Sequence, residues 1–341
     1  MKVDSGQFDW QICGHDRAVN FLQSTIKTGR IGQAYVFAGP ANLGKYTVAE
    51  RFIATLLCQA KADVKPCGQC FHCQQLAHGV HPDVYRLTRL VDEKTGKLRK
   101  KIIIDQVRDL KNRLSQASML NDYKVGIIDK ADELNTSAAN ALLKLLEEPT
   151  PRTVIILIAD DASRLPATIL SRCQQINFFP VATRLIEAFL TDRGVVEVRR
   201  VARLAYGRPG IAWSLVAKQE QLDDHNTNIS NFFLLARADL SQRFRLVDKL
   251  INFSGNEVFN SQLIGKIIND WQLVLRDLLL VASGNEYLVA DIEQLDNLKQ
   301  QSKNFDFFKI NKLVKLINQA GIYFDYNISS RLILENIIIN L

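Results

Sequence analysis

The chain has 341 residues, which at roughly 100–200 residues per domain is enough for two or three domains. Apolar residues make up 47% and charged residues 23%, proportions that argue against a disordered chain or a fibre. Lys and Arg number 43 against 36 Asp and Glu, so the net charge of +7 permits a nucleic-acid partner without requiring one.

The sequence also bears on the compartment. The N-terminus, MKVDSGQFDW, lacks the apolar segment of a secretory signal. No apolar run reaches the roughly 18 residues needed to cross a membrane. Four of the 6 cysteines lie within residues 58–73, a density typical of metal binding rather than of a disulfide framework. We therefore expect a cytoplasmic protein with no membrane association.

A short apolar run at 33–39 predicts a buried strand, and helical periodicity follows from Lys45 to about Cys58. Between them, GPANLGKYT fits the G-x-x-x-x-G-K pattern of a P-loop (Walker A) through Gly39, Gly44 and Lys45. In such a loop the backbone N–H groups converge on phosphate oxygens, and the helix N-terminus adds positive potential. We expect a P-loop scaffold rather than a mere steric turn between strand and helix.

The residue after Lys45 departs from the P-loop pattern. That position normally carries Ser or Thr, whose hydroxyl holds Mg²⁺. Here it is Tyr46, whose oxygen lies at the end of a rigid ring, and Thr47 lies about 100° further round the helix. We therefore expect a degenerate nucleotide site, and whether ATP or ADP still binds is left open.

Cys58, Cys67, Cys70 and Cys73 follow the pattern C-x8-C-x2-C-x2-C. Four thiolates are the ligands of a closed tetrahedral zinc site, with Zn–S distances near about 2.3 Å. Four buried free cysteines at this density are the less favoured alternative. We therefore expect one structural Zn²⁺ in an insertion at 58–73, because four sulfur ligands leave no open position for catalysis.

Residues 86–113 carry a concentration of basic side chains that accounts for most of the net charge. A contact with nucleic-acid phosphates is one interpretation, because each neutralised phosphate adds salt-dependent affinity. A solvated hairpin is the other, and we favour it for 94–101. No pattern here predicts the reading of base sequence.

KVGIIDK, at 124–130, predicts a second buried strand ending in Asp129, the type of acid that orients the metal in P-loop enzymes. The next position normally carries the Glu that activates the attacking water. Here it is Lys130, a cation that cannot accept the proton. Without a hydroxyl at 46 and a carboxylate at 130, we expect no useful ATP hydrolysis.

Further strands and helices alternate beyond this point. Asn135 or Thr136 is expected to cap a helix that Pro149 ends. TVIILIA, at 153–159, predicts a third strand, and 174–179 is a candidate for a fourth. Strands that alternate with helices predict a parallel sheet with helices on both faces.

After Pro180 the pattern changes to helices alone. Short helical patterns interrupted by glycines fill 181–218, and every signal from about Leu222 onwards is helical. One stretch repeats apolar residues at steps of three and four: Ile264, Ile267, Ile268, Trp271, Leu275, Leu278 and Leu279. We expect an α/β domain at 1–179, a small helical domain at 180–221 and a helical bundle at 222–341.

LPATILSRCQQI, at 165–176, places Arg172 just before a strand, where an ordinary surface residue would also fit. Together with the motifs described above, this segment makes the chain similar to the delta-prime family of the bacterial DNA polymerase III clamp loader, within the AAA+ class. The resemblance spans the α/β half and the small helical domain, and the bundle matches it only by length and helicity. The resemblance rests on these motifs: HDRAVNFL (15–22), GPANLGKYT, the four-cysteine insertion, IDQVRDL (104–110), NALLKLLEEP (140–149) and LSRCQQI (170–176).

The resemblance implies a fold and an assembly. Loaders of this family are five-subunit rings that open the sliding clamp and place it on primed DNA. It implies that 180–221 is a lid and that 222–341 is an oligomerisation collar. The implied partners are gamma/tau ATPase subunits and the delta subunit in a hetero-pentamer, within a polymerase (nucleotidyltransferase) holoenzyme. Contact with the sliding clamp would be indirect or weak, and contact with primed DNA would involve its backbone at most.

The resemblance also assigns roles to single residues. In this family the Arg of the S-R-C motif reaches the ATP site of a neighbouring subunit. Arg172 is thereby implied to be an arginine finger acting in trans, a group worth about 10³–10⁵ in rate.

The departures from the family pattern indicate which kind of subunit this is. A gamma or tau subunit would keep Ser or Thr at 46, Glu at 130 and an Arg in a G-x-x-R lid motif. Here the lid reads Gly207-Arg208-Pro209-Gly210, and the polar sensor falls on either Asp160 or Asp161. We expect a non-catalytic subunit without ATPase activity of its own, and an active motor of gamma/tau type is the alternative.

Overall fold

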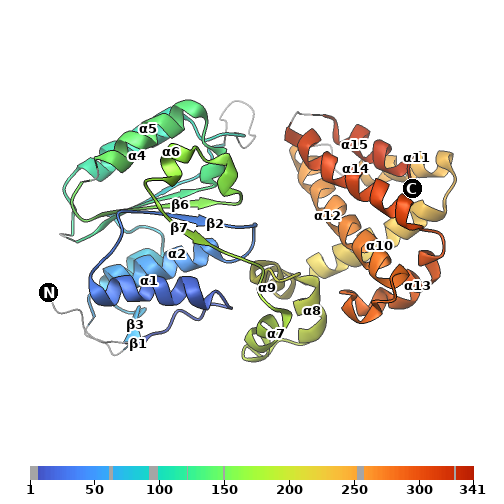
Figure 1. Cartoon of the computed structure of the whole chain (residues 1–341), viewed down its shortest axis with the longest axis horizontal. Coiled ribbons are helices and arrows are strands. Elements are labelled where there is room, and N and C mark those ends of the chain that lie inside the picture. The colour runs from blue at the N-terminus through green and yellow to red at the C-terminus, as the bar shows by residue number, and fades with distance from the viewer. Residues whose placement is uncertain are drawn as a thin grey trace. The chain divides into compact units, whose positions relative to one another are not determined.

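The computed structural model describes residues 7–60, 64–91, 99–120, 122–148, 150–251, 257–325 and 328–341. The chain forms two compact units (Figure 1). The first contains the residues up to Gly194 together with Gly207–Ile211, and the second contains Val195–Tyr206 and Ala212–Leu341. The predicted domain boundaries at 179 and 221 stay predictions. Pro149 and most of the predicted hairpin at 94–101 lie outside the described residues.

A five-stranded sheet forms the centre of the first unit, with strand order β4-β5-β6-β2-β7 and parallel pairing throughout. Its strands are β2 (Ala34–Ala38), β4 (Val84–Leu87), β5 (Lys124–Asp129), β6 (Thr153–Ala159) and β7 (Gln174–Asn177). The expected α/β class with a parallel sheet is therefore confirmed. The edge strand β4 was not among the predicted strands.

The remaining elements of the first unit surround this sheet. A short parallel ladder joins β1 (Gln7–Phe8) to β3 (Val64–Lys65). The helices are α1 (Asp16–Thr28), α2 (Lys45–Leu57), α3 (Phe71–Ala77), α4 (Ile104–Ser115), α5 (Thr136–Glu147), α6 (Ala167–Leu170) and α7 (Thr183–Thr191), with the 3₁₀ turns η1 (Ala131–Glu133) and η2 (Ala162–Arg164). Asn135 caps α5 by accepting the N–H of Ala138 at 2.7 Å, as one of the two predicted caps.

Alternate residues of each central strand supply two separate cores, because successive side chains of a strand point to opposite faces. Tyr35 and Phe37 of β2 join the core that contains α1 and α2. Val36, between them, joins the core that contains α4 and α5. Helices thus cover both faces of the sheet (Figure 1), and its middle strands are buried on both sides, as apolar runs predict.

The strand order also determines which loops meet. Since all five strands are parallel, their carboxyl ends lie at one edge of the sheet. β6 lies between β2 and β5. The residue after β6, Asp160, therefore lies between the P-loop that follows β2 and Lys130, which follows β5.

The second unit is helical throughout its described residues, as expected for this part of the chain. Its helices are α8 (Val198–Leu204), α9 (Pro209–Ala217, which begins in the first unit), α10 (Gln219–Arg237), α11 (Leu240–Ile251), α12 (Glu257–Ala282), α13 (Leu295–Ser302), α14 (Phe307–Asp325) and α15 (Ser330–Ile338), with 3₁₀ turns η3 (Glu286–Leu288) and η4 (Ile292–Gln294). No helix in the described ranges has the length and apolarity of a membrane span.

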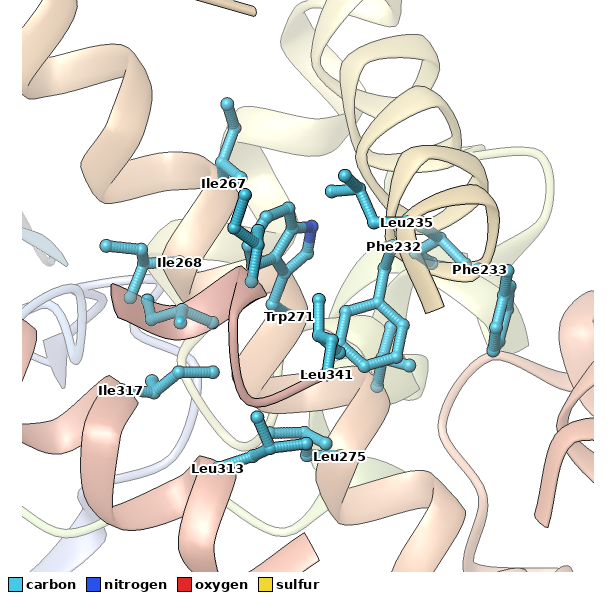
Figure 2. Close-up of a cluster of buried hydrophobic side chains, with 14 of the residues drawn as sticks. Phe232, Phe233, Leu235, Ile267, Ile268, Trp271, Leu275, Leu313, Ile317 and Leu341 are labelled. Carbon is cyan, nitrogen blue, oxygen red and sulfur yellow. The ribbon is translucent and has the colours of Figure 1, made fainter. Parts of the chain in front are cut away.

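Trp271 of α12 lies at the centre of the bundle core (Figure 2). Its ring is fully buried and meets Phe232 of α10 edge-on, with 5.8 Å between ring centroids. Its indole N–H donates to the carbonyl of Asn228 at 3.1 Å, so the one polar atom of the side chain is satisfied. The helical spacing of apolar residues predicted for 264–279 therefore corresponds to the buried face of α12.

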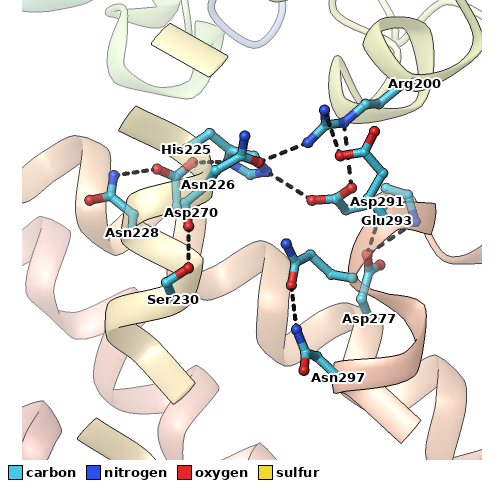
Figure 3. Close-up of polar contacts among 12 residues, drawn as sticks. Arg200, His225, Asn226, Asn228, Ser230, Asp270, Asp277, Asp291, Glu293 and Asn297 are labelled. Carbon is cyan, nitrogen blue, oxygen red and sulfur yellow. Dashed lines mark hydrogen bonds and ion pairs between the residues drawn. The ribbon is translucent and has the colours of Figure 1, made fainter. Parts of the chain in front are cut away.

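A buried polar network crosses the same unit (Figure 3). The His225 imidazole lies 2.8 Å from a carboxylate oxygen of Asp270 and 3.7 Å from one of Asp291. Arg200 of α8 pairs with Glu293 at 2.7 Å and lies 3.6 Å from Asp291. Burial opposes the charge on His225, but the hydrogen bonds and charges of the two aspartates raise its pKa to about 9.

This network predicts a pH-dependent stability. Because the folded pKa of His225 lies above its ordinary value of 6.5, its contribution is fully present below about pH 6.5 and is lost as the pH rises through about 9. Between about pH 7 and pH 10, the free energy of unfolding should fall more steeply in the wild type than in His225→Gln, by up to a few kcal/mol. Urea unfolding of both proteins across this range measures the difference, and parallel pH profiles would contradict it.

Candidate functional site

The P-loop follows β2 and turns directly into α2. Gly39 has φ of 145°, and a Cβ there would lie 2.2 Å from the carbonyl oxygen of Phe178, so only glycine fits. Gly44, with φ of 92°, is the N-cap of α2, and Lys45 is its first residue. The predicted strand–loop–helix scaffold is therefore present.

Lys45 is occupied by contacts within the chain. Its side chain is only 5% exposed, and its ammonium donates to the carbonyls of Gly39 and of Pro40, the latter at 2.8 Å. A carboxylate oxygen of Asp160 accepts the third hydrogen bond at 2.9 Å. A lysine ammonium has three donors, so none is left for a phosphate in this arrangement.

Asp160 links two lysines at the carboxyl edge of the sheet. One of its oxygens pairs with Lys45, and the other accepts from the ammonium of Lys130. Burial opposes ionisation of Asp160, but its hydrogen bonds to the two lysines outweigh this and lower its pKa. Asp161 instead accepts the N–H of Ser163 at 2.9 Å and caps η2. Of the two candidate sensor residues, Asp160 is therefore the one at the P-loop.

Tyr46 and Asp129 each contact residues of the same chain. Tyr46 lies beside Glu50 and Arg86, and burial together with the Glu50 carboxylate raises its pKa. The guanidinium of Arg86 forks onto Glu50 at 3.0 and 3.1 Å. A carboxylate oxygen of Asp129 accepts the backbone N–H of Lys130 at 3.0 Å, whereas the carboxylate that pairs with Lys45 belongs to Asp160.

The G-R-P-G segment lies directly on the P-loop. The N–H of Gly210 donates to the carbonyl of Asn42 at 2.9 Å, and His15 hydrogen-bonds the carbonyl of Leu43 at 2.8 Å. A Cβ at position 210 would lie 2.9 Å from the Asn42 oxygen. Position 210 therefore accepts a side chain only if the P-loop shifts.

The four cysteines of the predicted zinc site come together. Their sulfur atoms all lie within 4.8 Å of one another, and those of Cys67 and Cys73 are 3.9 Å apart. A tetrahedral zinc with Zn–S bonds of about 2.3 Å needs sulfurs about 3.8 Å apart. Although burial raises the pKa of the Cys67 thiol, nearby N–H groups, including that of Cys70, lower it to about 6. The four cysteines could thus hold one metal ion.

This cysteine cluster lies far from the P-loop. Helix α2 begins at the P-loop and runs for 13 residues, about 20 Å, to its C-cap Cys58. His72 lies between Cys70 and Cys73 in the sequence but is not part of the cluster. Its Nδ1 pairs with Nε2 of His81 at 2.9 Å, and His81 Nδ1 accepts the N–H of Asp83 at 3.2 Å. A metal here would therefore stabilise structure and would not touch a nucleotide.

Arg172 lies at the edge of the sheet opposite its own P-loop. It precedes β7, whose first residue, Gln174, pairs with Tyr35 near the start of β2. The P-loop starts after the end of β2 at Ala38, three strand residues or about 10 Å beyond Tyr35. The side chain is 38% exposed and pairs with Glu147 of α5 at 2.7 Å. Arg172 is thus a surface residue remote from the nucleotide residues of the same chain.

Comparisons with known proteins find similarity to subunits of DNA polymerase III. The family described as "DNA polymerase III, delta subunit" matches residues 14–182. DNA polymerase III subunit delta' of Pseudomonas aeruginosa is 46% identical over 180 residues, which cover 52% of this chain and 53% of that protein. Subunit delta' of Bacillus subtilis is 24% identical over 326 residues, covering 95% of each chain.

A motor subunit is also among the relatives. DNA polymerase III subunit tau of Bacillus subtilis is 25% identical over 332 residues, covering 91% of this chain and 57% of that protein. The chain therefore spans only 53% and 57% of the lengths of the Pseudomonas delta' and Bacillus tau relatives.

Proposed function

This chain belongs to the delta-prime family of DNA polymerase III subunits, and from this premise we propose that it is a non-catalytic subunit of a replicative clamp loader. In this proposal it helps to load the sliding clamp onto primed DNA during replication. It hydrolyses no ATP and supplies Arg172 to the ATP site of a neighbouring subunit. The observation that carries the proposal is the closed P-loop, in which Asp160 and two carbonyls take all three donors of Lys45.

Three further features support the absence of hydrolysis. Lys130 stands where a general base is needed, and its ammonium is already paired with Asp160. Tyr46 lies beside Glu50 and Arg86 instead of offering a hydroxyl to Mg²⁺. Gly210 lies against the P-loop backbone in place of a lid arginine. ATP or ADP would bind only after Lys45 had exchanged Asp160 for a phosphate.

The position of Arg172 supports its action in trans. The residue is exposed at the edge of the sheet opposite its own P-loop, so its guanidinium is available to another chain. A guanidinium suits this role because it is always charged and can fork onto two phosphate oxygens.

The proposed partners follow from the relatives. Those relatives are named as DNA polymerase III subunits, and we therefore propose gamma/tau ATPase subunits and a delta subunit as partners in a hetero-pentamer. The proposed membership of the polymerase holoenzyme and the cytoplasmic location have the same basis. The cysteine cluster is proposed to hold one structural Zn²⁺, which supplies no chemistry to the ATP sites.

The proposal predicts a contrast between the isolated chain and the reconstituted loader. The isolated chain should show no ATP turnover above that of Lys45→Ala, because both variants lack a general base and a metal-binding hydroxyl. A loader assembled from its other subunits without this chain should lose clamp loading and DNA-stimulated ATPase activity. Steady-state phosphate release and clamp transfer to primed DNA measure the two outcomes.

The alternative function is an active motor of gamma/tau type, and the similarity to Bacillus tau over 91% of the chain is the observation in its favour. Under that alternative, the isolated wild-type chain hydrolyses ATP and Lys45→Ala abolishes the turnover. Unchanged loading and ATPase activity without the chain would instead reject the proposed role in the loader.

A further inference from the structure

The guanidinium of Arg172 is held by its own chain: Nη1 contacts the Ser171 hydroxyl at 3.4 Å, and two closer anchors come from helices. Nη2 lies 2.7 Å from a carboxylate oxygen of Glu147, the last residue of α5. Nη1 donates to the carbonyl of Thr168 in α6 at 2.9 Å. The two anchors belong to different helices and approach different nitrogens of one planar group. The direction of the side chain is thereby defined, although the residue lies on the surface.

Both anchors lie near helix C-termini. Glu147 ends α5, and Thr168 belongs to the four-residue helix α6, which ends at Leu170. The C-terminus of a helix carries partial negative charge and favours a cation nearby. The backbone thus assists in holding the guanidinium in place even before the carboxylate is counted.

The contacts leave part of the guanidinium free. Arginine has five N–H donors in a fixed plane. Glu147 engages Nη2, and the Thr168 carbonyl and the Ser171 hydroxyl engage Nη1, so two of the five N–H groups remain to meet an incoming anion. At 38% and 48% exposure, the Arg172 and Glu147 side chains lie where such an anion can approach.

An ion pair this exposed contributes little to folding. Surface ion pairs gain little because water screens the two charges and fixing two long side chains costs entropy. Its effect on Arg172 is entropic instead, because an arginine side chain otherwise samples many rotamers and loses that freedom when it is fixed. Glu147 removes part of that cost before any second chain arrives.

We propose that Glu147 is a positioning residue for Arg172, holding the guanidinium in the orientation in which it meets the phosphates of nucleotide bound to a neighbouring subunit. This inference rests on the proposed function, because it assumes that Arg172 acts in trans. It adds that Glu147, at the end of α5, already orients the Arg172 guanidinium in the free subunit. Glu147 itself touches no nucleotide.

The test uses the reconstituted clamp loader and a set of matched variants. Glu147→Ala removes the anchor, and Glu147→Gln keeps a hydrogen-bond acceptor of the same shape without the charge. Glu148→Ala changes the adjacent exposed glutamate and is the control for charge alone. Arg172→Ala, alone and combined with Glu147→Ala, completes a double-mutant cycle. kcat and KM for ATP are measured with clamp and primed DNA present.

Glu147→Ala is expected to lower kcat at the ATP site that Arg172 reaches in the neighbouring subunit by about 3- to 10-fold without changing KM. A misdirected Arg172 guanidinium loses its contacts with the transition state, whereas ATP binding does not depend on it. Glu147→Gln should stay within about 2-fold of the wild type, and Glu148→Ala should be unchanged. In the Arg172→Ala background, Glu147→Ala should have no further effect, since Glu147 acts only through Arg172.

The outcomes separate the inference from the function on which it rests. If Arg172→Ala changes neither kcat nor loading, the proposed trans role fails. If Arg172→Ala lowers kcat but Glu147→Ala does not, the trans role stands and the positioning inference is overturned. The same conclusion follows if Glu147→Ala and Glu147→Gln both raise kcat. An equal loss from Glu147→Ala with and without Arg172 makes Glu147 a structural residue and also overturns the inference.

A second measurement needs only the isolated chain. Side-chain NMR relaxation of the Arg172 guanidinium should report greater mobility in Glu147→Ala than in the wild type, with Glu147→Gln in between. Unchanged mobility in Glu147→Ala would overturn the inference even if that variant failed to assemble into a loader.

Discussion

Cys73→Ser is expected to abolish stoichiometric zinc binding and to lower the free energy of unfolding of the first unit by several kcal/mol. Zinc binding in small peptides is worth about 10–16 kcal/mol and is coupled to folding, which sets an upper limit. The loss here should be smaller, because α2 and the sheet keep their own core around Phe52 and Tyr35. Elemental analysis of protein prepared without chelator and urea unfolding measure the two effects.

The effect of losing the metal should extend beyond the cysteines along one hydrogen-bond path. His72 lies between Cys70 and Cys73 of the cluster and pairs with His81, which accepts the N–H of Asp83. The Asp83 carboxylate in turn accepts the N–H groups of Met119 and Leu120 at 2.8 and 3.0 Å. Hydrogen exchange should therefore increase in the turn before β5 as well as at 58–73.

Cys173→Ser is the matched control, because Cys173 is a partly buried cysteine outside the cluster. It should retain the metal and nearly all of the stability. Absence of zinc from the wild-type protein, or equal stability of Cys73→Ser and Cys173→Ser, would contradict the structural zinc site.

Arg172→Ala is expected to fold and assemble normally but to lower the clamp- and DNA-stimulated ATPase activity of the loader. At the site that it serves, an arginine finger is worth about 10³–10⁵ in rate. The total loss should be partial, because the other ATP sites keep their own fingers. The exposed pair with Glu147 contributes too little to folding for its removal to be noticed by stability measurements.

Two further variants sharpen this test. Arg172→Lys keeps the charge but loses the planar fork, so it should restore only part of the activity. Arg108→Ala removes an exposed arginine of α4 and should leave ATPase and loading unchanged. Failure of Arg172→Ala to assemble, or full activity in the reconstituted loader, would make Arg172 a structural or bystander residue.

Much of the α/β unit was predictable because its signals are local. The apolar runs of β2, β5 and β6 mark strands that are buried on both faces, and a run of that kind is visible without any neighbour. The glycines and Lys45 of the P-loop and the cysteine spacing are likewise local. β4 escaped prediction because only Val84 and Leu87 of its four residues are buried, which leaves no apolar run.

The sequence by itself determined the class of sheet, the strand–loop–helix form of the P-loop, the spacing of the four cysteines and the departures from the P-loop pattern at Tyr46 and Lys130. Only the tertiary structure decided which partners the charged side chains of Asp160 and Arg172 contact. Asp160 lies 115 residues from Lys45 along the chain, and whether it or Asp161 faces the P-loop depends on where β6 ends. The contacts of Arg172 with Glu147 and of Gly210 with Asn42 likewise join separate elements. Residue types and spacing record local geometry, whereas such pairings arise from strand order and helix packing, which bring distant segments together.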